Sequence, residues 1–322
     1  MKAKENIKKN QHYVFQQYLK SWKEEASVWT LFRDKEQIEP RNTASVAKEN
    51  YFYKLTELTS KEVSYIDMFI RNESHNSLKE TQLNNILGAF IEYSKLKQEY
   101  GKRPTDAGLK SLKILEANYF ENMHERIENV GKKLIQCKSF NDFENIFHNE
   151  EERHKAITFL MAQYYRTKRM KEKIESIDTS LKDFSSSNIS TILSFLLAQN
   201  MALQTSCLSA NFVFLENNTQ ERFLTSDQPV INLSIKESSQ KILENCFYYP
   251  ITPRYSIIID SQTNAIENQG VFSTTSRTLT LNEVKEFNER IINSADKLIF
   301  SENEYQLRKI SPNAVVKKQK ST

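Results

Sequence analysis

Glycine and proline are scarce in this chain: 322 residues contain only 5 glycines and 6 prolines. Both residues mark turns, and an all-β sandwich or a loop-built binding protein needs many of them. Their scarcity therefore predicts long helices. It also excludes a glycine-rich phosphate loop, because no stretch of the sequence approaches G-x-x-x-x-G-K or G-x-G-x-x-G.

Hydrophobic residues make up 39% of the chain and charged residues 27%, so the sequence can both bury a core and stay soluble. The net charge of +4 neither requires nor excludes a nucleic-acid partner. Cys137, Cys207 and Cys246 form no C-x-x-C pair, which favours reduced thiols in a cytoplasm over a zinc ribbon or a disulfide framework. No apolar run is long enough for a membrane span, and none follows the basic start as in a signal peptide. We therefore expect a cytoplasmic protein without a membrane partner; its oligomeric state is not indicated.

Hydrophobic periodicity and charge divide the chain into parts. Residues 1–9 are predicted to form a basic flexible leader, residues 10–310 a single composite domain, and residues 311–322 a flexible basic tail. Within the domain, a helical block covers about residues 59–208 and a β-rich zone about residues 209–310. The fold class is therefore α+β, a mainly helical middle with small β elements contributed by the N-terminal and C-terminal zones. We expect these β elements to pair, because an isolated hairpin is only marginally stable.

Turn and strand signals predict the smaller elements near the N-terminus. "SVWTLFR" at residues 27–33 alternates as a half-buried strand does, and "NYFYKL" at residues 50–55 is typical of another short strand. "IEPRNTASVA" at residues 38–47 is predicted to be a turn region whose direction is fixed by Pro40.

The same signals predict the elements of the C-terminal zone. Residues 211–233 are predicted to form a hairpin, with Asn217 and Asn218 supplying the turn. "YYPITPRYSIIID" contains a β-rich run after two prolines, and "KLIFS" is typical of a strand. Between these two stretches, Asn282 is a candidate cap for a helix over residues 282–295.

Five stretches of the sequence resemble one known family. They are "QHYVFQQYL", "FLMAQYYRT", "FLLAQN", "RFLTSDQPV" and "YYPITPR", in that order along nearly the whole chain. Together they resemble the bacterial family catalogued as domain of unknown function 4238, with its H-Y-V-P-Q-x-Y-L opening, Q-x-x-R-T helix and T-S-D-x-P turn. Phe15 stands where the family usually has proline, and Gln11 replaces a residue that is often a second histidine. The resemblance implies a shared fold and shared special positions, but no reaction.

His12 is the first candidate for chemistry. It lies four residues before Gln16, so one helical turn would put both side chains on one face. Histidine titrates near neutrality and can donate or accept protons, and the Gln16 amide can bind a phosphate. The structural alternative is that His12 packs at a domain edge with its ring bonded to a backbone carbonyl. For one histidine considered alone, this alternative is the favoured interpretation.

Three further candidates lie on the predicted central helix. Gln163 falls on or beside its apolar stripe, where a polar side chain must find partners. Arg166 lies one turn further on, and an inward arginine needs an anion or a carboxylate, for which its planar fork is suited. Thr167 follows it as a binding candidate. A structural arginine–aspartate pair is the alternative.

Ser226 and Asp227 end a predicted strand just before a proline. Both residues are ordinary turn formers, and for this motif alone the turn interpretation is favoured. The functional interpretation is that Asp227 faces a cleft, where it binds a divalent metal ion, orients His12 or pairs with Arg166. Because polar residues of different types recur in separate segments, we favour one composite site that joins them.

The stretch "KRMKEK" after Thr167 is more basic than its surroundings. With Tyr164 and Tyr165 beside it, this stretch would suit a nucleic-acid backbone and stacked bases, although a solvated helix end is the more common explanation of such a charge run. The other histidines are predicted to lie on charged helical faces and to be unremarkable; they are His75, His124, His148 and His154.

These residues leave the functional class open between three hypotheses. In the first, the protein is a nuclease-like phosphodiester hydrolase of a bacterial conflict or defence system. His12 is then the general acid or base, Arg166 stabilises phosphate charge, and Asp227 orients His12 or holds a metal ion. In the second, the protein is a non-catalytic sensor or binding module for a small anion or a protein partner. In the third, the polar cluster is an internal hydrogen-bond network that fixes the N-terminal segment to the body.

Overall fold

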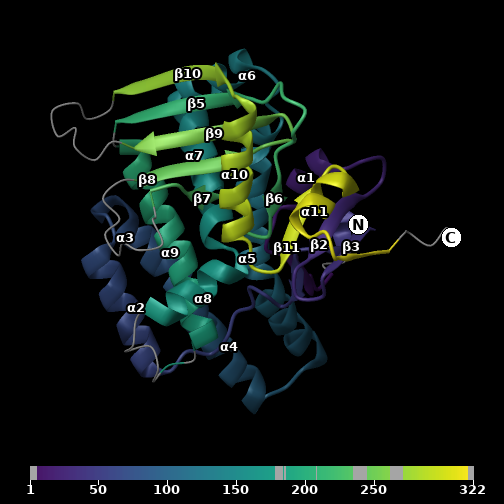
Figure 1. The fold of residues 1–322 in the computed structure, drawn as a ribbon. Coiled ribbons are helices and arrows are strands. Elements are labelled where there is room, and N and C mark those ends of the chain that lie inside the picture. The colour runs from purple at the N-terminus through teal and green to yellow at the C-terminus, as the bar shows by residue number, and fades with distance from the viewer. Residues whose placement is uncertain are drawn as a thin grey trace, which may run out of the picture.

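The computed structural model describes residues 6–177, 184, 186–207, 209–234, 245–261 and 271–317, and Figure 1 shows its fold. The α-helices are α1 (Gln16–Leu19), α2 (Ser60–Glu73), α3 (Asn76–Gln82), α4 (Gly88–Lys102), α5 (Asp106–Ile135), α6 (Phe140–His148), α7 (Glu150–Tyr165), α8 (Lys168–Ile177), α9 (Ser186–Cys207), α10 (Leu281–Ser294) and α11 (Glu304–Ile310). The strands are β1 (Asn10–His12), β2 (Val28–Phe32), β3 (Gln37–Arg41), β4 (Lys48–Asn50), β5 (Ala210–Glu216), β6 (Thr225–Ser226), β7 (Ile231–Asn232), β8 (Asn245–Pro250), β9 (Tyr255–Ser261), β10 (Phe272–Thr278), β11 (Leu298–Ser301) and β12 (Val315–Val316). The α+β class is confirmed, and no described helix is long and apolar enough to cross a membrane.

The larger sheet has the strand order β10-β5-β9-β8-β7, with β10 and β5 parallel and the other pairs antiparallel. Its side chains alternate between two helical layers, as strand geometry requires. Tyr248 of β8 stacks on Phe287 of α10 at 4.4 Å between ring centroids. On the other face, Tyr249 meets Phe159 of α7, and Phe212 of β5 stacks on α6. The sheet is therefore enclosed between α10 and the pair α6 and α7 (Figure 1).

The smaller sheet joins the two ends of the chain. Its strand order is β12-β3-β2-β11-β6, so strands from the N-terminal zone lie between strands from the C-terminal zone. β2 pairs antiparallel with β11 and β3 parallel with β12. The predicted pairing of the terminal β elements is confirmed. The predictions of strands at β2 and β11, and of the β-rich run that forms β9, are confirmed as well.

Three local predictions are wrong. The strand expected at 50–55 lies earlier, at β4, because Tyr51 takes a left-handed backbone conformation (φ 56°) that ends the extended run. Pro40 does not lie in a turn but within β3, opposite Trp29. It is tolerated there because only one neighbouring strand is paired with it. The cap of α10 is Thr280, which forms a capping box with Glu283, rather than Asn282.

The predicted hairpin over residues 211–233 is also wrong. β5 pairs with β9 and β10, whereas β6 belongs to the smaller sheet and β7 pairs with β8 at the edge of the larger sheet. The turn itself is present, since Asn217 Oδ1 accepts a hydrogen bond from the Thr219 amide at 3.0 Å. The turn was predicted correctly and the strand pairing was not. Turn residues specify the local backbone conformation, but they do not specify which strands pair.

Both predicted flexible ends make contacts where they are described. The Lys8 amide donates to Asn118 Oδ1 of α5 at 2.8 Å, and Asn118 Nδ2 donates to the Asn6 carbonyl at 3.0 Å. At the other end, residues 315–316 of the predicted tail form β12. Residues 1–5 and 318–322 lie outside the described part of the chain.

The N-terminal segment is docked into the body. Val14, Tyr18, Leu19 and Trp22 are fully buried. Tyr18 Oη lies 2.6 Å from Thr225 Oγ1 of the smaller sheet and 2.7 Å from the Pro250 carbonyl of the larger sheet. The first helix of the chain therefore lies where the two sheets meet.

The contact between α5 and α7 gives the first testable prediction. A Cβ added to Gly131 of α5 would lie 2.1 Å from Cγ of the buried Phe159 ring of α7. Gly131→Ala should therefore lower the free energy of unfolding by about 1–3 kcal/mol through overpacking. Gly101→Ala in α4 is the matched control, because nothing lies within 4 Å of its added Cβ. It should raise stability by about 0.5–1 kcal/mol. Urea denaturation measures the unfolding free energy of both variants. A Gly131→Ala variant as stable as Gly101→Ala would show that α5 and α7 are not closely packed at this position.

Candidate functional site

Arg166 is the centre of the docking contact between α7 and the N-terminal segment. Its side chain is buried, and its Nη2 donates to the His12 carbonyl at 2.7 Å and its Nε to the Tyr13 carbonyl at 3.1 Å. Its Nη1 forms an ion pair with Glu128 Oε1 of α5 at 2.6 Å. The Arg166 carbonyl in turn accepts from the Tyr53 hydroxyl at 3.1 Å. The predicted inward arginine is thus present, but its carboxylate partner is Glu128 and not Asp227.

Asp227 is held by a second backbone cluster. Its Oδ1 accepts from the amide of Asp296 at 2.9 Å, and its Oδ2 accepts from the amides of Lys297 and Leu298 at 2.8 and 2.9 Å. Burial raises the pKa of Asp227 to about 6, although the three hydrogen bonds act in the opposite direction. The Asp227 carboxylate thus fastens the turn between α10 and β11 to the end of β6.

Ser226 and Thr167 meet through Gln228. Ser226 Oγ donates to the Gln228 carbonyl at 3.0 Å, and the Thr167 hydroxyl donates to the Gln228 side-chain oxygen. Gln228 Nε2 donates to the carbonyls of Tyr164 and Val230. All of these groups are buried. The structure therefore brings together the Q-x-x-R-T helix and the T-S-D-x-P turn through contacts within the protein.

His12 and Gln16 lie at the edge of this network. Both are half-buried, and Nε2 of His12 has no described partner. Burial, followed by the charges of Arg166 and Lys48, lowers the pKa of His12 to about 4, so the ring is neutral at pH 7. The described side-chain hydrogen bonds include none from Gln16. His12 contributes its carbonyl to the Arg166 contact, while a catalytic role for its ring stays a prediction.

Gln163 and His124 are buried polar side chains without described partners. Gln163 is fully buried, and neither amide atom has a described hydrogen bond. His124 was predicted to lie on a charged surface face, and this prediction is wrong: its exposed fraction is 4%. Its ring lies against Tyr53 at 4.4 Å and Phe195 at 4.6 Å. It borders a cavity of about 30 Å³, which is large enough for a water molecule.

Arg166 and Asp227, two of the predicted site residues, hold segments of the protein together rather than line an open cleft. The described donors of Arg166 and acceptors of Asp227 are directed to protein groups, which leaves few of them for a substrate. Among the described residues, no group of three His, Cys, Asp or Glu side chains is arranged to hold a metal ion. A metal-binding role for Asp227 therefore also stays a prediction.

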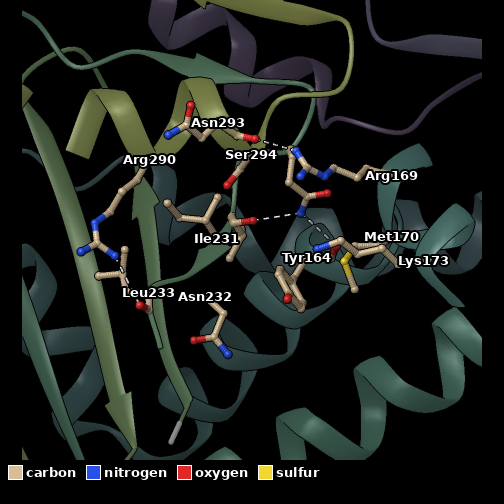
Figure 2. A pocket seen from close by; sticks show the side chains of 12 residues that line it. Tyr164, Arg169, Met170, Lys173, Ile231, Asn232, Leu233, Arg290, Asn293 and Ser294 are labelled. Carbon is tan, nitrogen blue, oxygen red and sulfur yellow. Dashed lines mark hydrogen bonds between the residues drawn. The ribbon is translucent and has the colours of Figure 1, made fainter. Parts of the chain in front are cut away.

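A basic pocket of about 250 Å³ lies beside this network (Figure 2). Its described lining comes from α7, α8, the segment around β7, and α10; the residues are Tyr164, Arg169, Met170, Lys173, Gln228, Val230, Ile231, Asn232, Leu233, Arg290, Asn293 and Ser294. Three of these side chains are cationic, and none is a carboxylate. Figure 2 shows Arg169 and Lys173 on one side of the pocket and Arg290 on the other.

Helical spacing places the polar residues of this pocket. Arg169 and Lys173 are four residues apart on α8, and Arg290 and Ser294 are four residues apart on α10, so each pair shares a face. Arg169 Nη1 donates to the carbonyls of Asn293 at 2.9 Å and of Ala295 at 3.3 Å, which fixes its guanidinium against the end of α10.

Hydrogen-bond donors outnumber acceptors in the pocket. Arg169 uses only Nη1 in its described bonds, which leaves Nε and Nη2, and the Lys173 ammonium has no described partner. Arg290 Nη1 donates to the Leu233 carbonyl at 3.3 Å, and its Nη2 pairs with Glu286. The Nε of Arg290 has no described partner and is left as a donor. Partial desolvation, followed by repulsion from Arg169, lowers the pKa of Lys173. Such a set of donors is suited to an anion.

The sequence indicated half of this pocket. The basic run after Thr167 contains Arg169 and Lys173, which do line it. Tyr164 and Tyr165 are both buried and pack edge to face at 5.0 Å. Tyr164 lines the pocket, whereas Tyr165 does not. Arg290 was missed, because its spacing to Ser294 on α10 becomes meaningful only once α10 is known to lie opposite α8.

The fold and the site define an α+β protein with a docked N-terminal segment and a basic pocket between helices and a sheet edge. The chain matches the family model described as "Protein of unknown function (DUF4238)" over residues 10–304, and it belongs to this family. The comparisons with curated proteins and with solved structures found no match.

The Arg166 contact leads to a prediction about stability. Arg166→Met removes the donor from two backbone carbonyls and leaves the half-buried Glu128 carboxylate unpaired, so the variant should lose about 3–5 kcal/mol of unfolding free energy. Arg71→Met is the control, because Arg71 pairs with Asp67 on the surface and its loss should leave the melting temperature unchanged. A fully stable Arg166→Met protein would mean that Arg166 is available for a ligand.

His124 leads to a prediction about pH. Burial lowers the pKa of His124 well below its usual value, whereas the unfolded chain takes up the proton near pH 6.5. The unfolded state therefore binds more protons below that pH, and stability falls as the pH falls. His124→Phe should keep or raise stability at pH 7 and reduce the loss between pH 7 and pH 5 by about 1–3 kcal/mol.

The control for this measurement is His154→Gln, which changes an exposed histidine on α7 and should keep the wild-type pH dependence. Denaturant unfolding at the two pH values gives the result. An unchanged acid loss in His124→Phe would show that this ring accepts a proton in the folded protein.

Proposed function

We propose that the protein binds a small anionic ligand, a phosphate or phosphate ester, in the pocket between α8, β7 and α10. The observation that carries the proposal is that Arg169, Lys173 and Arg290 surround a cavity of about 250 Å³ whose described lining has no carboxylate. Arg169 and Lys173 have no described carboxylate partner, whereas Arg290 pairs with Glu286, which does not line the pocket. Cations gathered at a concave site attract anions and hold them by charge-assisted hydrogen bonds. The protein is thus a binding module or sensor for a small anion.

Binding is favoured over hydrolysis for a chemical reason. Hydrolysis of a phosphodiester needs an acid or base that can transfer a proton near neutral pH. The described lining of the pocket contains no histidine, aspartate or glutamate, and burial raises the pKa of Tyr164 to about 12. The nuclease-like role assigned to His12, Arg166 and Asp227 stays a prediction. A single-stranded nucleic acid remains one anionic partner to be tested.

The test is calorimetric titration with inorganic phosphate, against sodium chloride of equal ionic strength. Lys173→Gln and Arg290→Gln should each weaken phosphate binding about tenfold, the effect of losing one hydrogen bond from a charged donor. Phosphate binding that is absent in the parent, or unchanged in both variants, would overturn the proposal.

Two matched controls accompany these variants. Lys113→Gln removes an exposed lysine from α5. Arg308→Gln removes an arginine that pairs with Glu304 four residues before it, as Arg290 pairs with Glu286. Neither control residue lines the pocket, so phosphate binding should be unchanged in both.

A further inference from the structure

We propose that the ligand of this pocket is a small phosphate monoester with an aromatic or other apolar body of about one ring. This inference rests on the proposed function and adds the chemical class of the ligand. It follows from the division of the pocket into a cationic and an apolar part, from its closed floor, and from its volume.

The apolar part is a wall that continues from the core. Met170 and Ile231 are buried, and Leu233 is half-buried at its outer end. The Leu233 amide donates to the Cys246 carbonyl at 2.7 Å, and the Leu233 carbonyl accepts from Arg290. Leu233 therefore holds an apolar side chain beside a cation. A ligand that touches both needs an anionic group next to an apolar one.

The floor of the pocket is closed by hydrogen bonds within the protein. The Gln228 amide is directed to Thr167, to the Tyr164 carbonyl and to the Val230 carbonyl, so its donors and one acceptor are occupied. The Asn232 side-chain oxygen likewise accepts from the amides of Ser234 and Cys246. The Gln228 and Asn232 side chains are therefore not free to bind the hydroxyls of a sugar. A ligand body rich in hydroxyls is disfavoured there, because each buried hydroxyl needs a hydrogen-bond partner.

The volume limits the size of the ligand. Pockets for drug-sized ligands measure roughly 300–1,000 Å³, and this one measures about 250 Å³. A phosphate group and one ring can be accommodated, whereas a duplex or a long chain cannot be enclosed. Arg169 and Lys173 lie on one wall of the pocket and Arg290 on the opposite wall (Figure 2). We therefore expect the phosphate to bind near these cations and the ring to lie against the apolar wall.

The experiment compares three ligands by calorimetric titration: inorganic phosphate, glycerol phosphate and phenyl phosphate. We expect phenyl phosphate to bind about tenfold to a hundredfold more tightly than the other two, from the apolar area that its ring buries. Equal affinities for the two esters would overturn the inference and leave anion binding in place. No binding of any of the three would overturn the proposed function itself.

A variant tests the apolar wall separately from the charges. Leu233→Ser should remove most of the preference for phenyl phosphate while inorganic phosphate binds as before. Leu96→Ser, which changes a half-buried leucine of α4 away from the pocket, should retain the preference. A preference that survives in Leu233→Ser would overturn the inference. A single-stranded oligonucleotide that binds more tightly than phenyl phosphate would also overturn it, in favour of a nucleic-acid ligand.

Discussion

The docking of the N-terminal segment depends on the contacts of the buried Arg166 guanidinium. The guanidinium is charged and enclosed, and a buried charge is tolerated only where a counter-charge and hydrogen bonds replace its hydration. Glu128 supplies the charge, and the carbonyls of His12 and Tyr13 supply the hydrogen bonds. Two of the three acceptors are backbone carbonyls of the N-terminal segment. Arg166 therefore holds the main chain of this segment in place rather than a side chain. Tyr18 and Trp22 then reach the core where the two sheets meet.

The basic pocket depends on the same framework. The end of α7 carries Arg166 and Thr167, and Thr167 binds Gln228, which forms the pocket floor. At the end of α10, the carbonyls of the last turn accept from Arg33 and Arg169, and cations at that end of a helix are stabilised by its dipole. Arg169 therefore has two roles, in that it caps α10 and presents its remaining donors to the cavity.

Sequence patterns predicted what is local. The hydrophobic periodicity of the helical block and the alternation in β2 specify their elements because each pattern matches one backbone period. The wrong predictions concern contacts between segments that are distant in the sequence. The Asn217 turn is real, but the strands on either side of it pair with other strands. His124 has charged neighbours in sequence, yet its ring lies between Tyr53 and Phe195. Arg166 was expected to face inward, and only the packing of α5 against α7 identifies Glu128 as its partner.

The docking of residues 10–22 also determines when the fold can be completed. Their partners include Thr225 and Pro250, and β2, which follows them, lies beside β11. A ribosome releases these partners more than two hundred residues after Tyr18. Contacts so distant in sequence slow folding, because a long loop must close before they form. During synthesis, Tyr18 therefore lacks these partners until the strands that carry them emerge, and in this interval a nascent chain is most exposed to aggregation.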